Sequence, residues 1–119
     1  MDTIKTIALG TDAPSVHEPF HGFAEVLEGD PAAGVVWLRT TASGSGTLYA
    51  GIFVVQPSRF RFDFDHDECL HLIEGDVEIH VEGEAPVRLR AGDVAAFSAG
   101  TTSTWTVHAA LRKFFVISG

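Results

Sequence analysis

The stretch from residue 62 to residue 75 reads FDFDHDECLHLIEG, and the rest of the chain is organised around it. Its first half is acidic and polar and carries a histidine and a glutamate close together, His66 and Glu68. Its second half is an apolar run that ends at Gly75. A polar rim leading directly into a buried strand is typical of the mouth of a small barrel. The sequence therefore predicts a pocket at this point of the chain.

Short runs rich in Val, Ile, Phe and Thr alternate with turn residues on both sides of this stretch. Residues 60–64 and 77–82 alternate apolar and polar side chains with period two, as half-buried strands do. No segment has a sustained helical period with start and stop signals. About ten strands at this spacing predict an all-β sandwich or barrel. We expect one domain over residues 23–119, preceded by an irregular arm over residues 1–22 with room for one short strand.

Alternation assigns the side chains of the central stretch to two faces. If Glu68 points inward, every second residue along the strand does so too, unless a bulge intervenes. The residues placed on the Glu68 side in this way are Phe62, Phe64, His66, Leu70 and Leu72. Cys69 and His71 then point outward. Acidic neighbours disfavour a reactive thiol at Cys69, which we interpret as a small buried hydrophobe.

Chain length, composition and net charge argue against several classes of protein. A chain of 119 residues with 45% hydrophobic side chains is one folded domain by size. Its net charge of -8 argues against nucleic acid and anionic membrane surfaces as partners. The single cysteine, Cys69, excludes an intramolecular disulfide and fits a reducing compartment. No apolar stretch is long enough to span a bilayer, and the N-terminus does not resemble a signal peptide. We therefore expect a soluble, cytoplasmic protein.

Two motifs point to a family. Glu68 to Gly75 has the spacing Glu-x6-Gly and resembles the second half of the first cupin motif, while residues 92–100 resemble the second motif. Residues 51–60, 69–75, 104–107 and 112–115 more narrowly resemble the small single-domain cupins grouped with ureidoglycine aminohydrolase and the ethanolamine-utilisation cupins. The resemblance covers roughly residues 48–117. It implies a double-stranded β-helix, the jelly roll of the RmlC-like cupin barrel.

The metal ligands of that family are mostly replaced here. A metal-binding cupin has His-x-His three or four residues before the motif glutamate. The matching positions hold Phe62 and Phe64 or, with the other spacing, Arg61 and Asp63. The histidine of the second motif falls at Ser103, so only Glu68 remains of the usual ligands. The resemblance therefore implies no iron, manganese or zinc site of the usual kind, and we expect no cofactor.

Glu68 is the first candidate for chemistry. A carboxylate on the inner face of a barrel is costly to bury without a purpose, which favours a role as general acid or base. The alternative is a structural carboxylate paired with Arg59, Arg61 or a backbone amide. We expect those arginines to pair instead with the acidic residues beside them, Asp63 and Asp65.

His66 is the second candidate. With Glu68 it would form an acid/base pair, or part of a metal site completed by His17 or His21 from the arm. A catalytic metal needs about three protein ligands, and this count favours an ordinary turn histidine at position 66. His71, His80 and His108 are expected on outward faces.

The remaining pocket residues are inferred from alternation and from the family resemblance. We expect the mouth to be lined by Phe53, Phe62, Phe64, Ser103 and Trp105. Aromatic walls suit a flat or apolar small ligand, although they suit core packing equally well. The leading hypothesis is a small cupin that binds a small organic molecule, with metal-independent acid/base chemistry at Glu68. The alternatives are a metal-dependent enzyme resembling ureidoglycine aminohydrolase and a non-catalytic accessory or sensing protein. We expect a homodimer, because the outward faces are not uniformly polar.

Overall fold

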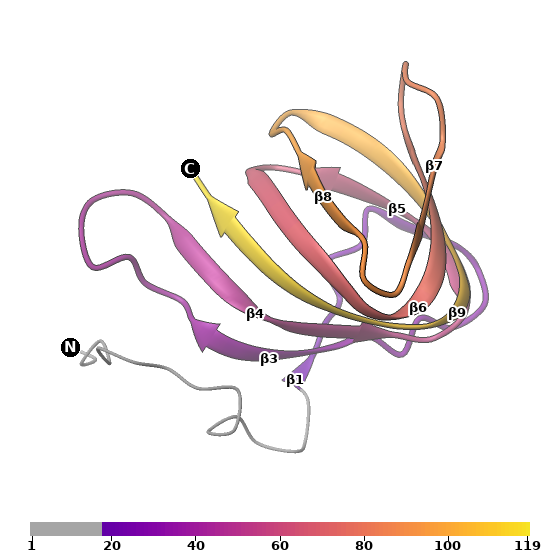
Figure 1. Cartoon of the computed structure of the whole chain (residues 1–119), viewed down its shortest axis with the longest axis horizontal. Helices are drawn as coiled ribbons and strands as arrows, with labels where there is room; N and C mark the ends of the chain where they lie inside the picture. The colour runs from indigo at the N-terminus through magenta and orange to yellow at the C-terminus, as the bar shows by residue number, and fades with distance from the viewer. Residues whose placement is uncertain (1–17) are drawn as a thin grey trace.

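The computed structural model describes residues 18–119 and consists of strands joined by turns (Figure 1). Most of the predicted arm, including His17, lies outside the described residues. The strands are β1 (Glu18–Pro19), β2 (Glu25–Glu28), β3 (Gly34–Arg39), β4 (Leu48–Val55), β5 (Ser58–Phe64), β6 (Asp67–Val81), β7 (Val87–Arg90), β8 (Val94–Phe97) and β9 (Thr101–Ser118). Over this part of the chain there is no helix that could cross a membrane.

Two long antiparallel strands, β6 and β9, form the spine of the molecule and pair along almost their whole length. The first half of β9 pairs with β5 and its second half with β4. On the other edge of β6, the first half pairs with β8 and the second half with β7. The spine therefore passes through two layers, and Figure 1 shows the resulting sheet curled around its own interior. This is the jelly-roll barrel that the sequence predicts.

The spine bends at Gly75. Its φ is +113°, a backbone conformation that suits glycine, and the register with β9 shifts on both sides of it. A Cβ atom at this position would lie 2.8 Å from the carbonyl oxygen of Ala110 and 2.8 Å from the Cα of Leu111. Glycine therefore lets the two strands stay paired through the bend.

The bend joins segments that the sequence pattern separates. The apolar run that ends at Gly75 and the alternating residues 77–82 predict two strands, but in the structure both belong to one continuous strand, β6. The strand that pairs with it, β9, is likewise continuous from Thr101 to Ser118. A glycine that would stop an isolated strand here forms a bulge, because pairing with the neighbouring strand continues past it.

The barrel interior is apolar and rich in aromatic rings. Alternation along β6 is confirmed, since Leu70 and Leu72 are buried while Cys69 and His71 are exposed. The interpretation of Cys69 as a buried hydrophobe was therefore wrong. Its neighbours in the strand point inward, which turns the thiol to the outer face. The largest fully buried side chains are Trp105, Phe60, Leu72, Ile79, Val55 and Val77, together with Ser103.

Candidate functional site

A cavity of about 60 Å³ lies inside the barrel, and its wall is almost entirely apolar. Roughly 10–15 Å³ suffices for one water molecule, so the cavity has room for a small organic molecule. Among the described residues that line it, only Glu68 and Lys113 are charged. The others are Phe20, Phe23, Val35, Trp37, Phe53, Phe60, Phe62, Trp105, Phe115 and Ile117.

Glu68 and Lys113 form an ion pair in the cavity wall. Lys113 Nζ donates to Glu68 Oε2 over 2.6 Å, and the two side chains are 7% and 3% exposed. Burying two charges is unfavourable unless they are paired at close range, so each depends on the other. Among the described residues, no fully buried side-chain nitrogen or oxygen lacks a hydrogen-bond partner.

Aromatic rings surround the ammonium group of Lys113. Its Nζ lies 4.8 Å from the ring centroid of Trp105, 5.1 Å from that of Phe53 and 5.6 Å from that of Phe115. Ring faces carry negative electrostatic potential and attract a cation at these distances. The rings therefore help to hold a positive charge inside an otherwise apolar barrel.

Strand geometry brings the pair together. Glu68 lies near the start of β6, opposite Ile117 of β9, and Lys113 lies farther along the same partner strand, opposite Leu72. Both side chains point inward, and Lys113 reaches back along the barrel wall to meet the carboxylate.

Lys113 was missed by the sequence analysis, although a signal for it was present. Leu111, Phe115 and Ile117 share the same parity in the last strand, and the first two are buried. Alternation places Lys113 between them on the inward face. A lysine on the apolar face of a strand is an exception that needs a buried partner, and the only carboxylate assigned to the interior was Glu68.

The predicted pocket residues separate into two groups. Phe53, Phe62 and Trp105 line the cavity. Phe64 and Ser103 are not among its lining residues. Phe64 is buried and stacks on Phe97 with ring centroids 4.7 Å apart.

Ser103 positions two of the cavity residues. Its hydroxyl donates to the carbonyl oxygen of Phe62 over 2.8 Å and accepts from Trp105 Nε1 over 3.0 Å. The serine therefore fixes the orientation of the indole ring beside Lys113. This contact is a structural role that the sequence did not reveal.

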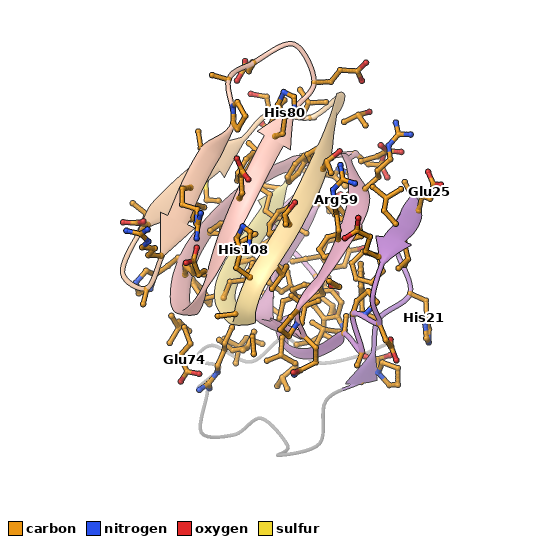
Figure 2. All side chains as sticks on the ribbon, turned by 90° about the vertical axis from the view of Figure 1, so that its right-hand side faces the viewer. His21, Glu25, Arg59, Glu74, His80 and His108 are labelled. Atoms are coloured by element: carbon orange, nitrogen blue, oxygen red, sulfur yellow. The ribbon has the colours of Figure 1, made fainter. Side chains whose placement is uncertain are left out.

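His66 does not join Glu68 in the cavity. It is exposed, does not line the cavity and lies near the C-terminal Gly119. The parity argument failed here because β5 ends at Phe64 and β6 starts at Asp67, so a turn separates the two strands. His21, proposed as a further ligand, is also exposed and points away from the barrel (Figure 2).

The two arginines considered as partners of Glu68 lie on the outer surface. Arg59 lies 3.9 Å from Glu28, and Arg61 lies 3.8 Å from Glu25, in exposed ion pairs between β5 and β2. The prediction that they pair with Asp63 and Asp65 is therefore wrong, because β2 supplies acidic partners across the sheet. Neither arginine contacts Glu68, whose partner is Lys113.

The outer face carries the other histidines. His80 and His108 are exposed, and Figure 2 shows them with Arg59 on the outside of the sheet. The outward positions predicted for these two residues are confirmed.

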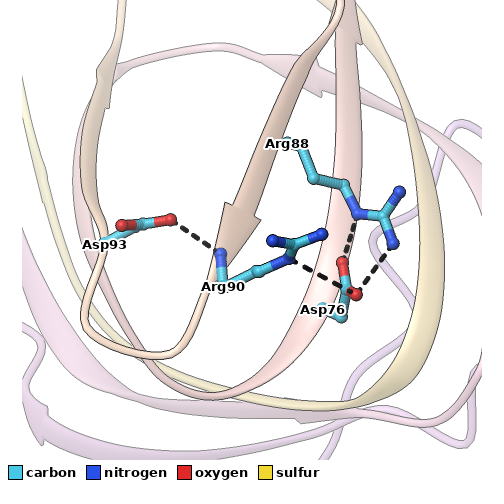
Figure 3. A network of polar contacts seen from close by, with 4 residues as sticks. All are labelled: Asp76, Arg88, Arg90 and Asp93. Atoms are coloured by element: carbon cyan, nitrogen blue, oxygen red, sulfur yellow. Dashed lines mark hydrogen bonds and ion pairs between the residues drawn. The ribbon is translucent and has the colours of Figure 1, made fainter.

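A polar network on the surface braces the chain just after the bend (Figure 3). Arg88 donates through Nε and Nη2 to the two carboxylate oxygens of Asp76, and Arg90 Nε lies 3.9 Å from the same carboxylate. The Arg90 backbone amide donates to Asp93. The Arg88 hydrogen bond and the two arginine charges hold the pKa of Asp76 below its ordinary value. This network connects β6, β7 and the following turn, and none of its residues lines the cavity.

The donor set at the cavity does not fit the metal site of cupins. Phe62 and Phe64 have no donor atoms in their side chains, and the Ser103 hydroxyl is engaged by its two neighbours. Glu68 is bound to an ammonium group instead. Within residues 18–119, no group of three His, Cys, Asp or Glu side chains is placed to hold a metal ion.

Comparison with solved structures identifies the fold. A putative ethanolamine utilization protein Q from Salmonella typhimurium LT2 is 26% identical, with a TM-score of 0.63 over 72% of this chain and 68% of that chain. A DUF861 family protein from Thermotoga maritima is 28% identical, with a TM-score of 0.52 over 54% of this chain and 73% of that chain. Ectoine synthase from P. lautus, 18% identical, shares the fold with a TM-score of 0.66 over 79% of this chain and 68% of that chain.

A comparison with curated protein sequences found no match. The sequence profile of the EutQ-like cupin domain matches residues 42–115, which include Glu68, Lys113 and most of the cavity wall. The chain therefore belongs to the EutQ-like cupin family.

Proposed function

We propose that this protein binds a small organic molecule in the barrel cavity and that Glu68 and Lys113 supply the polar contacts. The observation that carries the proposal is a buried ion pair in the wall of an otherwise apolar cavity. Ligand sites in proteins combine apolar walls with a few polar groups that fix orientation. A buried ion pair contributes little net stability compared with apolar residues of the same size, which supports a role other than packing.

The pair has capacity for further hydrogen bonds. An ammonium group has three donors, and the only protein acceptor that Lys113 has among the described residues is Glu68 Oε2. Glu68 Oε1 likewise has no hydrogen-bond donor among these residues. A ligand in the cavity would therefore have an acceptor site and donor sites side by side.

We further propose that any chemistry at this site uses Glu68 as an acid or base without a metal ion. The carboxylate lies at the cavity wall, and a positive charge is already provided by Lys113. A metal-dependent activity like that of ureidoglycine aminohydrolase would need ligands that Phe62, Phe64 and the exposed His66 do not offer. A non-catalytic binding or sensing role uses the same cavity and differs only in the absence of turnover.

A thermal-shift screen of small acids, amides, ureides and ketones tests the proposal. A molecule that binds only the folded state raises the melting temperature of the protein. At a ligand concentration of 100 times Kd, the free energy of unfolding rises by about 2.7 kcal/mol. The wild-type protein should respond to at least one class of molecule. Filling the cavity by Ile117→Trp should remove that response, while Val94→Trp, which adds the same ring at an exposed site, should not. A response that survives Ile117→Trp and is lost in Val94→Trp would place the ligand outside the cavity and contradict the proposal.

A further inference from the structure

We infer that the ligand is a small uncharged carbonyl compound and that Lys113 and Glu68 can enolise it. This inference rests on the proposed function, since it names the substrate class and the reaction of the same cavity. Lys113 would hold the carbonyl oxygen, and Glu68 would accept a proton from the adjacent carbon.

The charge of the site selects for an uncharged ligand. The two charged groups in the cavity wall neutralise each other, and the rest of the wall is apolar. A carboxylate bound to Lys113 would lie beside the carboxylate of Glu68, and an amine bound to Glu68 would lie beside the ammonium of Lys113. Like charges at such distances in a desolvated site repel strongly. A neutral molecule meets no such penalty.

The hydrogen-bonding groups of the site match a carbonyl and its neighbouring carbon. Lys113 has donors to spare for a carbonyl oxygen, and its charge is held in place by three rings. Glu68 Oε2 is engaged by Lys113, which leaves Oε1 as the basic atom. Because the two groups touch each other, a molecule that contacts Lys113 through its oxygen brings the next carbon within reach of Glu68.

The proposed reaction conserves atoms and electrons without a co-reactant. Glu68 takes a proton from the carbon next to the carbonyl, and the C–H electron pair becomes a carbon–carbon double bond. The π electrons of the carbonyl move to its oxygen, where the Lys113 ammonium stabilises the developing negative charge. If the proton on Glu68 exchanges with solvent before a proton returns to the same carbon, that carbon takes up hydrogen from solvent; return of the proton to another position gives an isomer.

Three probes on one carbon ring test the substrate class. Cyclopentanone is neutral, cyclopentanecarboxylate is an anion and cyclopentylamine is a cation at neutral pH. We expect cyclopentanone to bind the wild-type protein at least tenfold more tightly than either charged probe, by thermal shift or NMR titration. Tighter binding of either charged probe would overturn the charge argument and leave the proposed function intact. No binding of any probe or of any compound in the wider screen would contradict both.

Hydrogen exchange tests the reaction. In D2O, proton NMR should show loss of the ring hydrogens beside the carbonyl of cyclopentanone, about 100-fold faster than with equal concentrations of free acetate and an alkylamine. Glu68→Gln should abolish the acceleration while binding persists. If that variant does not fold, Glu68→Met/Lys113→Met removes both charges together; it should show no exchange and should bind cyclopentanone at least tenfold more weakly, because the hydrogen bond from Lys113 to the carbonyl oxygen is lost.

Two results would overturn the reaction while leaving binding intact. One is saturable binding of cyclopentanone by the wild-type protein with exchange no faster than in the free-buffer control. The other is a covalent adduct on Lys113 after borohydride treatment, detected by mass spectrometry, which would indicate an imine in place of a hydrogen bond.

Discussion

Replacing Lys113 by methionine perturbs the site most informatively, because methionine keeps most of the length of the side chain and removes its charge. The Lys113 side chain is 7% exposed and the Glu68 side chain 3% exposed, so Lys113→Met leaves a buried, unpaired Glu68. Removing one member of a buried ion pair typically costs about 3–5 kcal/mol. We expect a loss of this size in the free energy of unfolding of Lys113→Met, and a similar loss for Glu68→Met.

The double variant Glu68→Met/Lys113→Met separates the charge effect from packing. With both charges removed, no unpaired ion remains, and the apolar side chains fill similar volumes. The double variant should therefore lie within about 1 kcal/mol of the wild type or be more stable. The coupling energy between the two sites is the sum of the two single losses minus the loss in the double variant, and it should therefore be at least about 5 kcal/mol.

Urea denaturation followed by circular dichroism measures all four proteins. A domain of this size has a stability of roughly 6–18 kcal/mol, so a loss of 3–5 kcal/mol is measurable without complete unfolding in most of that range. The slope of the denaturation curve should stay constant, so that the midpoint reports stability alone. Single variants that each cost less than about 1 kcal/mol, with additive effects in the double variant, would refute the buried, coupled pair.

Three other predictions follow from the structure. Gly75→Ala should destabilise the protein by about 2 kcal/mol or more, because the φ of Gly75 is +113° and a Cβ atom there would press on the β9 backbone. Gly83 has a φ of +88° but open space around it, so Gly83→Ala should lower the free energy of unfolding by less in the same denaturation assay. Because the folded-state pKa of Asp76 is lowered, its ion pair contributes stability above about pH 4, and this contribution is lost as the pH falls below that value. Asp76→Asn should therefore weaken this part of the pH dependence of unfolding. The difference between the variant and the wild type should shrink in high salt. Dialysis against EDTA should leave the melting temperature unchanged, and metal analysis should find no stoichiometric manganese, iron or zinc; a stoichiometric metal that is lost in His66→Ala would contradict metal independence.

Much of the fold could be predicted from the sequence because alternation within one strand is a local property. Leu70 and Leu72 followed from the position of Glu68, and Val77 and Ile79 are fully buried as their spacing requires. The bend at Gly75 could not be predicted, because a glycine within a strand pattern reads equally as an end or as a bulge. Only pairing with β9 decides between the two.

The site could be predicted only in part because it depends on contacts between strands. The inward position of Glu68 and the aromatic wall could be predicted from strand alternation and family resemblance. The inward direction predicted for His66 was wrong, because a turn separates this residue from β6. Lys113 lies 45 positions along the chain from Glu68, and no local pattern connects them. Its inward position could be read from its own strand, yet its partner required the register between β6 and β9.

A crystal structure of the protein grown with cyclopentanone tests the central claim most directly. We expect the ring inside the barrel, between Trp105 and Phe53, with its carbonyl oxygen within hydrogen-bond distance of Lys113 Nζ. Cyclopentanone bound elsewhere, with the cavity closed or filled by rearranged side chains, would contradict it.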